Sequence, residues 1–232
     1  MEVAIDFSHD VRLIRYLDST LSATQFRLRA DLMPTTDLED LDFDIVIAKI
    51  KFWLDTIVCR SIAFCCRNQT AFDMLLADDG NPRLSNHLMI TPEEPQDDHL
   101  AVLLQSKLTA LAGGKMQFGC IRIESDSPSG LTFTYVGEWQ EDLPGMSDWF
   151  SKKPYYFEEP WWCRDDISTL DIIAANEDDY SKRPFWAMRL DFIENSIRPE
   201  KKDHDDAPVE ESVVKGTFRP KVINGGKDDP RP

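Results

Sequence analysis

The stretch DFDIVIAKIKFWLDTIVCRSIAFCC, residues 42–66, is the most apolar segment of the chain and decides the fold. Its apolar side chains recur every three or four residues, the spacing that gathers them on one face of a helix. Further apolar residues widen this stripe until it covers most of the circumference, and a helix that is apolar nearly all round is a buried one. We therefore predict a central core helix over about residues 42–66. Its stripe comprises Val46, Ile50, Trp53, Leu54, Ile57, Val58 and Ile62.

The same segment is long enough to cross a bilayer, but its charges argue against a membrane span. Lys49, Lys51, Asp55 and Arg60 lie within it, and each would cost about 2.5–3.5 kcal/mol at the bilayer centre. We expect no membrane association.

The chain is strongly acidic, with 42 Asp and Glu against 26 Lys and Arg among 232 residues, a formal charge of −16. Proteins that hold nucleic-acid phosphates concentrate basic side chains on one surface, and no basic cluster of that kind occurs here. The charge favours basic partners or metal cations, or serves only solubility. We expect no direct nucleic-acid binding.

The five cysteines are odd in number and form no CxxC pair. This usage is typical of reduced core cysteines and not of a disulfide framework or a zinc site. The opening residues, MEVAIDFSHD, lack the basic and apolar regions of a signal peptide. We predict a cytoplasmic protein.

Alternation of apolar and polar residues predicts several strands. Residues 116–124 and 131–139 alternate on either side of the turn-forming SDSPSG, which predicts an antiparallel hairpin. Residues 25–32 and 184–192 alternate as well.

Helical spacing is found in three further segments, residues 11–21, 70–76 and 100–111. The third has Asp97 or Asp98 as its N-cap and Gly113-Gly114 as its stop signal. Together these elements predict an α+β fold, an antiparallel sheet packed on the buried central helix, in one domain of residues 1–197. Residues 198–232 are polar, charged and rich in proline, so we predict a disordered tail there.

An aromatic and acidic stretch, WFSKKPYYFEEPWW at residues 149–162, has two interpretations. It packs on the sheet edge and the central helix, or it anchors a protein partner whose basic groups match its acids. In the tail, an apolar and basic island at residues 213–223 either docks in a partner's groove or folds back on the acidic domain. The predicted partner-binding residues are Trp149, Phe150, Tyr155, Tyr156, Glu158, Glu159, Trp161, Trp162, Phe218 and Arg219.

A metal site is the weaker alternative. Asp97 and His99 stand at a predicted helix start, where they serve as cap and solvated histidine or as metal ligands. Asp165 and Asp166 belong to an acidic cluster of the kind that a two-metal hydrolase or nuclease requires. No GxSxG elbow and no P-loop spacing occurs, and we expect no cofactor.

The leading hypothesis is a non-catalytic, cytosolic interaction or regulatory protein that presents an acidic, aromatic-rich surface to a protein partner. In one variant of this hypothesis, the acidic surface imitates the charge of a nucleic acid, and the partner is a nucleic-acid-binding protein. The alternatives are a metal-dependent hydrolase or nuclease that uses clustered carboxylates, and a subunit of a homo-oligomeric assembly whose aromatics close a symmetric interface.

Overall fold

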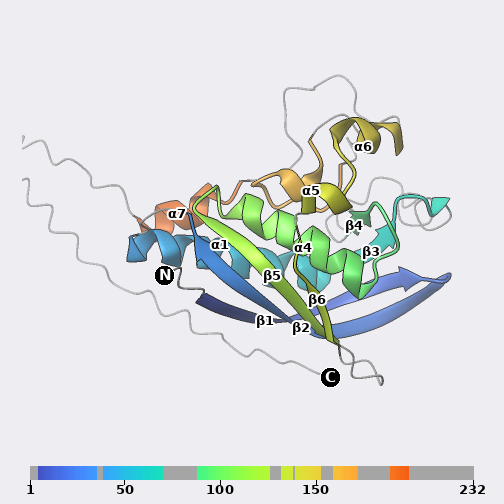
Figure 1. Ribbon diagram of the computed structural model, residues 1–232, viewed down its shortest axis with the longest axis horizontal. Helices are drawn as coiled ribbons and strands as arrows, with labels where there is room; N and C mark the ends of the chain where they lie inside the picture. The colour runs from blue at the N-terminus through green and yellow to red at the C-terminus, as the bar shows by residue number, and fades with distance from the viewer. Residues whose placement is uncertain are drawn as a thin grey trace, which may run out of the picture. The chain divides into compact units, whose positions relative to one another are not determined.

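The computed structural model describes residues 5–35, 39–69, 88–125, 132–137, 139–152, 159–171 and 189–198. All of these ranges fall within one compact unit, Met1–Pro199. They form an α+β fold, as the sequence predicts, with helices packed on a six-stranded sheet (Figure 1). The strands are β1 (Ile5–Leu17), β2 (Thr20–Pro34), β3 (Ile62–Cys65), β4 (Leu88–Thr91), β5 (Met116–Ser125) and β6 (Thr132–Tyr135). The helices are α1 (Asp40–Thr56), α4 (Asp97–Leu111), α5 (Trp139–Asp142), α6 (Met146–Lys152) and α7 (Asp191–Ile197), with 3-10 turns η1 (Val58–Arg60) and η2 (Trp161–Cys163).

The strand order is β4-β3-β1-β2-β5-β6. From β1 to β6 each neighbouring pair is antiparallel, whereas β3 runs parallel to both β1 and β4. The sheet is therefore mixed, and the expectation of an antiparallel sheet holds for one side of it only. Parallel neighbours need a long crossover connection, and between β1 and β3 the chain supplies one that contains β2 and α1.

The long hairpin of β1 and β2 replaces the helix expected at residues 11–21, which was wrong. The two strands pair continuously from Ile5 opposite Leu32 to Leu17 opposite Thr20. Asp18 and Ser19 connect them with φ of 47° and 62°, the left-handed conformation that a two-residue hairpin turn of the primed type requires. The apolar residues of this segment include some with helical spacing and some that alternate as in a strand. The continuous ladder with β2 decides in favour of the strand.

Along β1 and β2, one face of the sheet is covered and the other is exposed in the described part of the chain. Alternate residues of β1 and β2 are buried, among them Val11, Leu13, Leu28 and Leu32, and α1 and α4 lie on this side (Figure 1). The opposite face carries ion pairs between strands: Arg27 with Asp10 at 2.9 Å, Arg29 with Glu124 at 3.1 Å and Arg122 with Asp31 at 3.3 Å.

The predicted central helix exists, but it is shorter than expected. Val46, Ile50, Trp53 and Leu54 are fully or almost fully buried, as the stripe predicts. The helix ends at Thr56, and residues 62–65 form β3 instead of a last helical turn. β3 lies between β1 and β4, and strands buried on both faces are apolar throughout, so the sequence of β3 continues the apolar run of the helix without a break.

The second buried helix and the hairpin that follows it are present as predicted, but the N-cap of the helix is Gln96 and not Asp97 or Asp98, and the second strand of the hairpin ends at Tyr135 instead of Trp139. α4 begins at Asp97, and Gly113 and Gly114, with φ of 60° and 77°, end it. β5 and β6 pair antiparallel, from Glu124 opposite Thr132 to Ile121 opposite Tyr135.

Several predictions lie outside the described residues, including the helix at 70–76, most of the strand at 184–192, and the tail from 199. Where the chain is described again, Arg189 forms an isolated bridge with Asp166, and α7 follows from Asp191. Within the described ranges, no helix combines the length and the apolar character needed to span a membrane.

Candidate functional site

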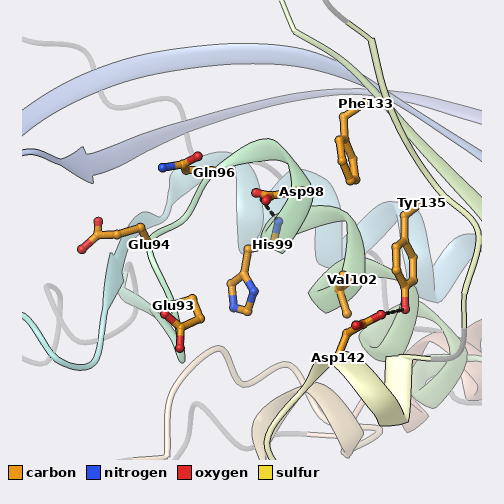
Figure 2. Close-up of a pocket in the computed structure, with 9 residues that line it drawn as sticks. All are labelled: Glu93, Glu94, Gln96, Asp98, His99, Val102, Phe133, Tyr135 and Asp142. Atoms are coloured by element: carbon orange, nitrogen blue, oxygen red, sulfur yellow. Dashed lines mark hydrogen bonds between the residues drawn. The ribbon is translucent and has the colours of Figure 1, made fainter.

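A hollow of about 510 Å³ lies beside the N-terminal half of α4 (Figure 2). We call it the acidic groove. It is lined by Glu93, Glu94 and Gln96 from the connection between β4 and α4, Asp98, His99 and Val102 from α4, Phe133 and Tyr135 from β6, and Asp142 from α5. A smaller hollow of about 290 Å³ shares Glu93, His99 and Asp142 with it and adds Glu141 and Lys152.

Local backbone geometry orients these side chains. Phe133 and Tyr135 are two residues apart on β6, so they point to the same side of the strand, and both are half-buried while Thr132 and Thr134 are exposed. The Thr91 hydroxyl donates to the carbonyl of Glu93 at 2.5 Å, which tightens the turn at the end of β4. The backbone N–H of Gln96 donates to the carbonyl of Glu94 at 2.7 Å. These bonds hold the glutamates next to the first turn of α4.

The carboxylates of the groove are only partly compensated. Glu93 pairs with Arg67, and Asp142 accepts a hydrogen bond from the Tyr135 hydroxyl at 2.5 Å. Within the described part of the chain, Glu94 and Asp98 form no ion pair. The arrangement is thus a concave surface with an excess of negative charge beside two aromatic rings.

His99 does not offset this charge at neutral pH. Burial lowers its pKa to about 4, against the opposing effect of Asp98 and with a smaller contribution from Arg67. Figure 2 shows its ring pointing into the space between Glu93 and Asp142. The Nε2 atom is buried and has no hydrogen-bond partner among the described residues. The groove therefore offers carboxylates, aromatic surface and a neutral imidazole.

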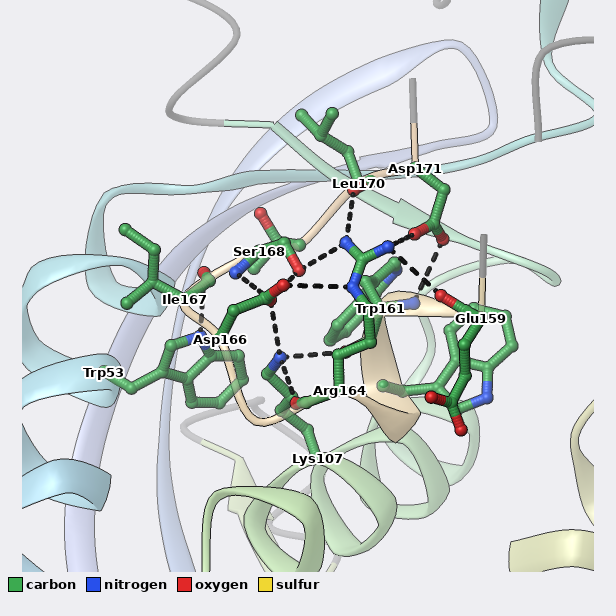
Figure 3. Close-up of polar contacts among 12 residues, drawn as sticks. Trp53, Lys107, Glu159, Trp161, Arg164, Asp166, Ile167, Ser168, Leu170 and Asp171 are labelled. Carbon is green, nitrogen blue, oxygen red and sulfur yellow. Dashed lines mark hydrogen bonds and ion pairs between the residues drawn. The ribbon is translucent and has the colours of Figure 1, made fainter. Parts of the chain in front are cut away.

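A second cluster of charges lies in the interior, around Lys107 of the same helix. Lys107 is 0% exposed, and its ammonium donates to the carbonyls of Trp161 and Arg164, each at 2.8 Å, and lies 3.6 Å from Asp166 (Figure 3). Arg164 bridges two buried acids: its Nε is 3.1 Å from Asp166 and its Nη1 is 2.8 Å from Asp171. We call Lys107, Arg164, Asp166 and Asp171 the buried network.

Hydrogen bonds complete this network. Ser168 donates to Asp166 from both its N–H and its hydroxyl, and Asp171 accepts from Trp149 Nε1 at 2.8 Å and from the N–H of Trp161 at 3.1 Å. The Lys107 ammonium also lies 5.9 Å from the ring centroids of Trp53 and Trp161, within reach of a cation–π interaction. Two cations and two carboxylates thus neutralise one another inside the protein.

Burial sets the pKa values in this network. It lowers the pKa of Lys107 to about 8, although Asp166 opposes the shift, and it raises that of Asp171 to about 6, although Arg164 opposes it. For Asp166, burial acts to raise the pKa, but Lys107, Arg164 and the bonds from Ser168 together lower it.

The tryptophans of the aromatic stretch belong to the core. Trp149, Trp161 and Trp162 are each 0% exposed, so their assignment to a partner-binding surface was wrong for this structure. Trp161 packs on Trp53 of the central helix with ring centroids 6.5 Å apart, and its Nε1 donates to the carbonyl of Ile90 at 2.8 Å. The packing interpretation therefore applies to them, and they give no support to a symmetric interface.

The other predicted contact residues divide into two groups. Glu159 is described and exposed. The side chain of Phe150 and all of Tyr155, Tyr156, Glu158, Phe218 and Arg219 lie outside the described residues, so their assignment stays a prediction.

Three of the four predicted metal ligands, the aspartates, are occupied by other partners. The carboxylate of Asp97 lies 2.7 Å from Arg15 and accepts from the Ser125 hydroxyl at 2.7 Å. Asp165 pairs with Arg189 at 2.7 Å, and Asp166 belongs to the buried network. Among the described residues, these aspartates and His99 do not form a group of converging metal ligands; such a group is formed by His9, Asp55 and Cys59.

Sequence reasoning missed both charged clusters. For the acids of TPEEPQDDH, residues 91–99, the sequence predicts a connection, a helix cap and, as the weaker alternative, metal ligands at Asp97 and His99; their number within nine residues was the signal for the groove. Lys107 was detectable as a charge inside the apolar run LLQSKLTAL of α4, residues 103–111.

Comparisons with known proteins give no indication of function. No protein-family model matches the sequence, and no curated protein matches it significantly. Among solved structures, the uncharacterized protein WS1659 from Wolinella succinogenes aligns over 59% of this chain and 99% of its own, with a TM-score of 0.37 and 12% sequence identity. A likeness of this degree carries no argument about what the chain does.

Proposed function

We propose that this chain is a non-catalytic, cytoplasmic interaction protein that binds a basic segment of a protein partner in the acidic groove. The observation that carries the proposal is the combination of carboxylates and aromatic rings in one hollow, with Glu94 and Asp98 free of ion pairs in the described part of the chain. Arginine and lysine side chains complement such a surface in both respects, since they pair with carboxylates and lie on aromatic faces.

Electrostatics support this choice of ligand. His99 is neutral at pH 7 because burial lowers its pKa to about 4, so it neither repels a cation nor compensates the acids. The formal charge of −16 on the whole chain adds a long-range attraction for basic partners. Proteins that bind DNA or RNA present basic segments to the phosphates. In one variant of the proposal, the partner is such a protein, and the acidic groove binds it by imitating the charge of the nucleic acid.

The test is a binding measurement by fluorescence anisotropy. The probes are a labelled peptide of alternating arginine and glycine, and the same peptide with glutamine in place of arginine. We expect the wild-type protein to bind only the arginine peptide, with an affinity that falls as salt increases. The substitutions Glu94→Gln and Asp142→Asn together should weaken binding by about 2- to 30-fold, because exposed ion pairs contribute about 0.2–1 kcal/mol each.

A charge-matched control separates the groove from the overall charge. The substitutions Asp6→Asn and Asp44→Asn remove two exposed carboxylates elsewhere and should leave the affinity within about twofold. Equal weakening by both double variants would show that net charge alone attracts the peptide. That result, or a failure of the wild type to bind the arginine peptide at low salt, would overturn the proposal.

A further inference from the structure

A group of metal-ligand side chains lies away from the groove, where β1, α1 and η1 meet. His9 comes from β1, Asp55 from the last turn of α1 and Cys59 from η1. One ligand atom of each residue, an imidazole nitrogen, a carboxylate oxygen or the thiol sulfur, lies within 4.8 Å of the other two. We propose that His9, Asp55 and Cys59 bind a divalent transition-metal cation of the zinc class.

The donor types fit this class of metal. Imidazole nitrogen, carboxylate oxygen and thiolate sulfur are the ligands that proteins use for Zn²⁺, at about 2.0–2.3 Å from the ion. In a tetrahedral site, ligands at those distances lie roughly 3.3–3.7 Å from one another. Calcium and magnesium are excluded by the thiol and imidazole, because these hard cations take oxygen ligands.

The present geometry needs only a small adjustment to close around an ion. His9 Nε2 and Asp55 Oδ1 are 3.0 Å apart, in direct contact with each other. The side chain of Asp55 is 63% exposed, so it can rotate without disturbing the core, whereas that of His9 is 14% exposed and is stacked near Phe7. The histidine and the cysteine are thus the fixed points of the site and the aspartate is its movable ligand.

The surroundings of Cys59 also suit a metal-bound thiolate. The backbone N–H of Arg12 points to its sulfur at 3.5 Å, and a donor at that position stabilises negative charge on sulfur. A metal-bound cysteine is deprotonated, so binding would release the thiol proton to solvent. The side chain of Asp55 is 63% exposed, so water can reach the fourth position.

The experiment uses the full chain and two metals. Zinc affinity is measured by competition with a chromophoric chelator, and Co²⁺ is titrated to detect the thiolate-to-cobalt charge-transfer band in the near ultraviolet. We expect one metal ion per chain and a charge-transfer band in the wild type. The isosteric Cys59→Ser should abolish the band, and both it and His9→Asn should lower zinc affinity by about 100-fold or more, since even an outer-shell partner accounts for 10–100-fold.

The controls address the other thiols of the chain. Cys65 and Cys66 are adjacent and buried, Cys120 lies on β5 and Cys163 on η2, so Cys65→Ser, Cys66→Ser, Cys120→Ser and Cys163→Ser should each keep the cobalt band and the zinc affinity. Circular dichroism of each metal-free variant establishes that it is folded. Zinc binding that survives Cys59→Ser, a band that disappears only with Cys65→Ser or Cys66→Ser, or the absence of stoichiometric binding in the wild type would each overturn the assignment.

Discussion

Two charged regions lie against α4: the acidic groove beside its N-terminal half and the buried network around Lys107. They differ in how fully their charges are compensated. At the start of α4, the acidic groove gathers carboxylates around a half-open hollow and compensates only some of them. Further along, the buried network matches two cations with two carboxylates and surrounds them with hydrogen-bond donors and acceptors. A buried charge has to be paired, whereas an uncompensated charge at a surface hollow is available to a ligand. We therefore propose a structural role for the buried network and ligand recognition for the acidic groove.

The largest expected effect comes from breaking the buried network with Asp166→Asn. This change keeps the volume of the side chain but leaves Lys107 and Arg164 without one of their counter-charges. Removing one partner of a buried pair typically costs 3–5 kcal/mol, and we expect a loss of this size in the free energy of unfolding measured with urea. The neighbouring Asp165→Asn is the control, because Asp165 pairs with Arg189 near the surface, and it should cost less than about 1 kcal/mol. Equal losses in the two variants would remove the distinction between network and surface.

We expect an effect of intermediate size in the pH dependence of the free energy of unfolding, caused by His99. Its pKa in the folded protein is about 4, below its ordinary value of 6.5. The unfolded chain thus binds a proton in this range that the folded protein does not, so His99 contributes stability that is present above pH 6.5 and is lost as the pH falls towards 4. A shift of this size corresponds to up to about 3 kcal/mol.

Urea unfolding at pH 7 and at pH 4.5 measures this difference. His99→Gln should lose less stability than the wild type between the two pH values, because glutamine does not titrate. Titration of the His99 ring by NMR gives the pKa directly. A midpoint near 6.5 would mean that the imidazole is protonated in mildly acidic solution and would weaken the contrast between the groove acids and their neutral neighbour.

The smallest effect on stability is expected in the groove. Glu94→Gln removes a carboxylate that has no ion pair in the described part of the chain, so the free energy of unfolding should stay within about 0.5 kcal/mol of the wild type. Urea unfolding at pH 7 in low salt measures it. A loss above 1 kcal/mol would indicate that the groove acids hold the fold together, in contradiction to their role as a binding surface.

The sequence predicted the elements whose patterns are local. The stripe around Trp53 identified the central helix, and the alternation in residues 116–124 and 131–139 identified the β5–β6 hairpin, because side-chain periodicity alone carries that information. It failed at β1, where Val11, Ile14 and Leu17 have helical spacing while Val11 and Leu13 alternate as in a strand, and the pairing with β2 decides. It also extended the helix through β3, since a doubly buried strand and a buried helix are equally apolar.

The candidate site was less accessible from the sequence because it depends on distant segments. Glu94 and Asp98 meet Tyr135 and Asp142 only through the placement of β6 and α5 beside α4. Similarly, an aromatic run rich in tryptophan is compatible with a partner-binding surface or with the core until its burial is known. The contact of Trp161 with Trp53 shows that this tryptophan belongs to the core. His9, Asp55 and Cys59 belong to three different elements, so no local spacing could connect them.

The segment at residues 159–171 also covers one edge of the sheet. β4 is an end strand, and the exposed backbone of an end strand is a template for pairing with other chains. Here the N–H of Ile90 donates to the carbonyl of Thr169, while the carbonyls of Ile90 and Leu88 accept from Trp161 Nε1 and from the Thr169 hydroxyl. The segment that carries most of the buried network thus also shields this edge. Loosening it should cause self-association of the chain before global unfolding, through the strand that the tryptophan and threonine now cover.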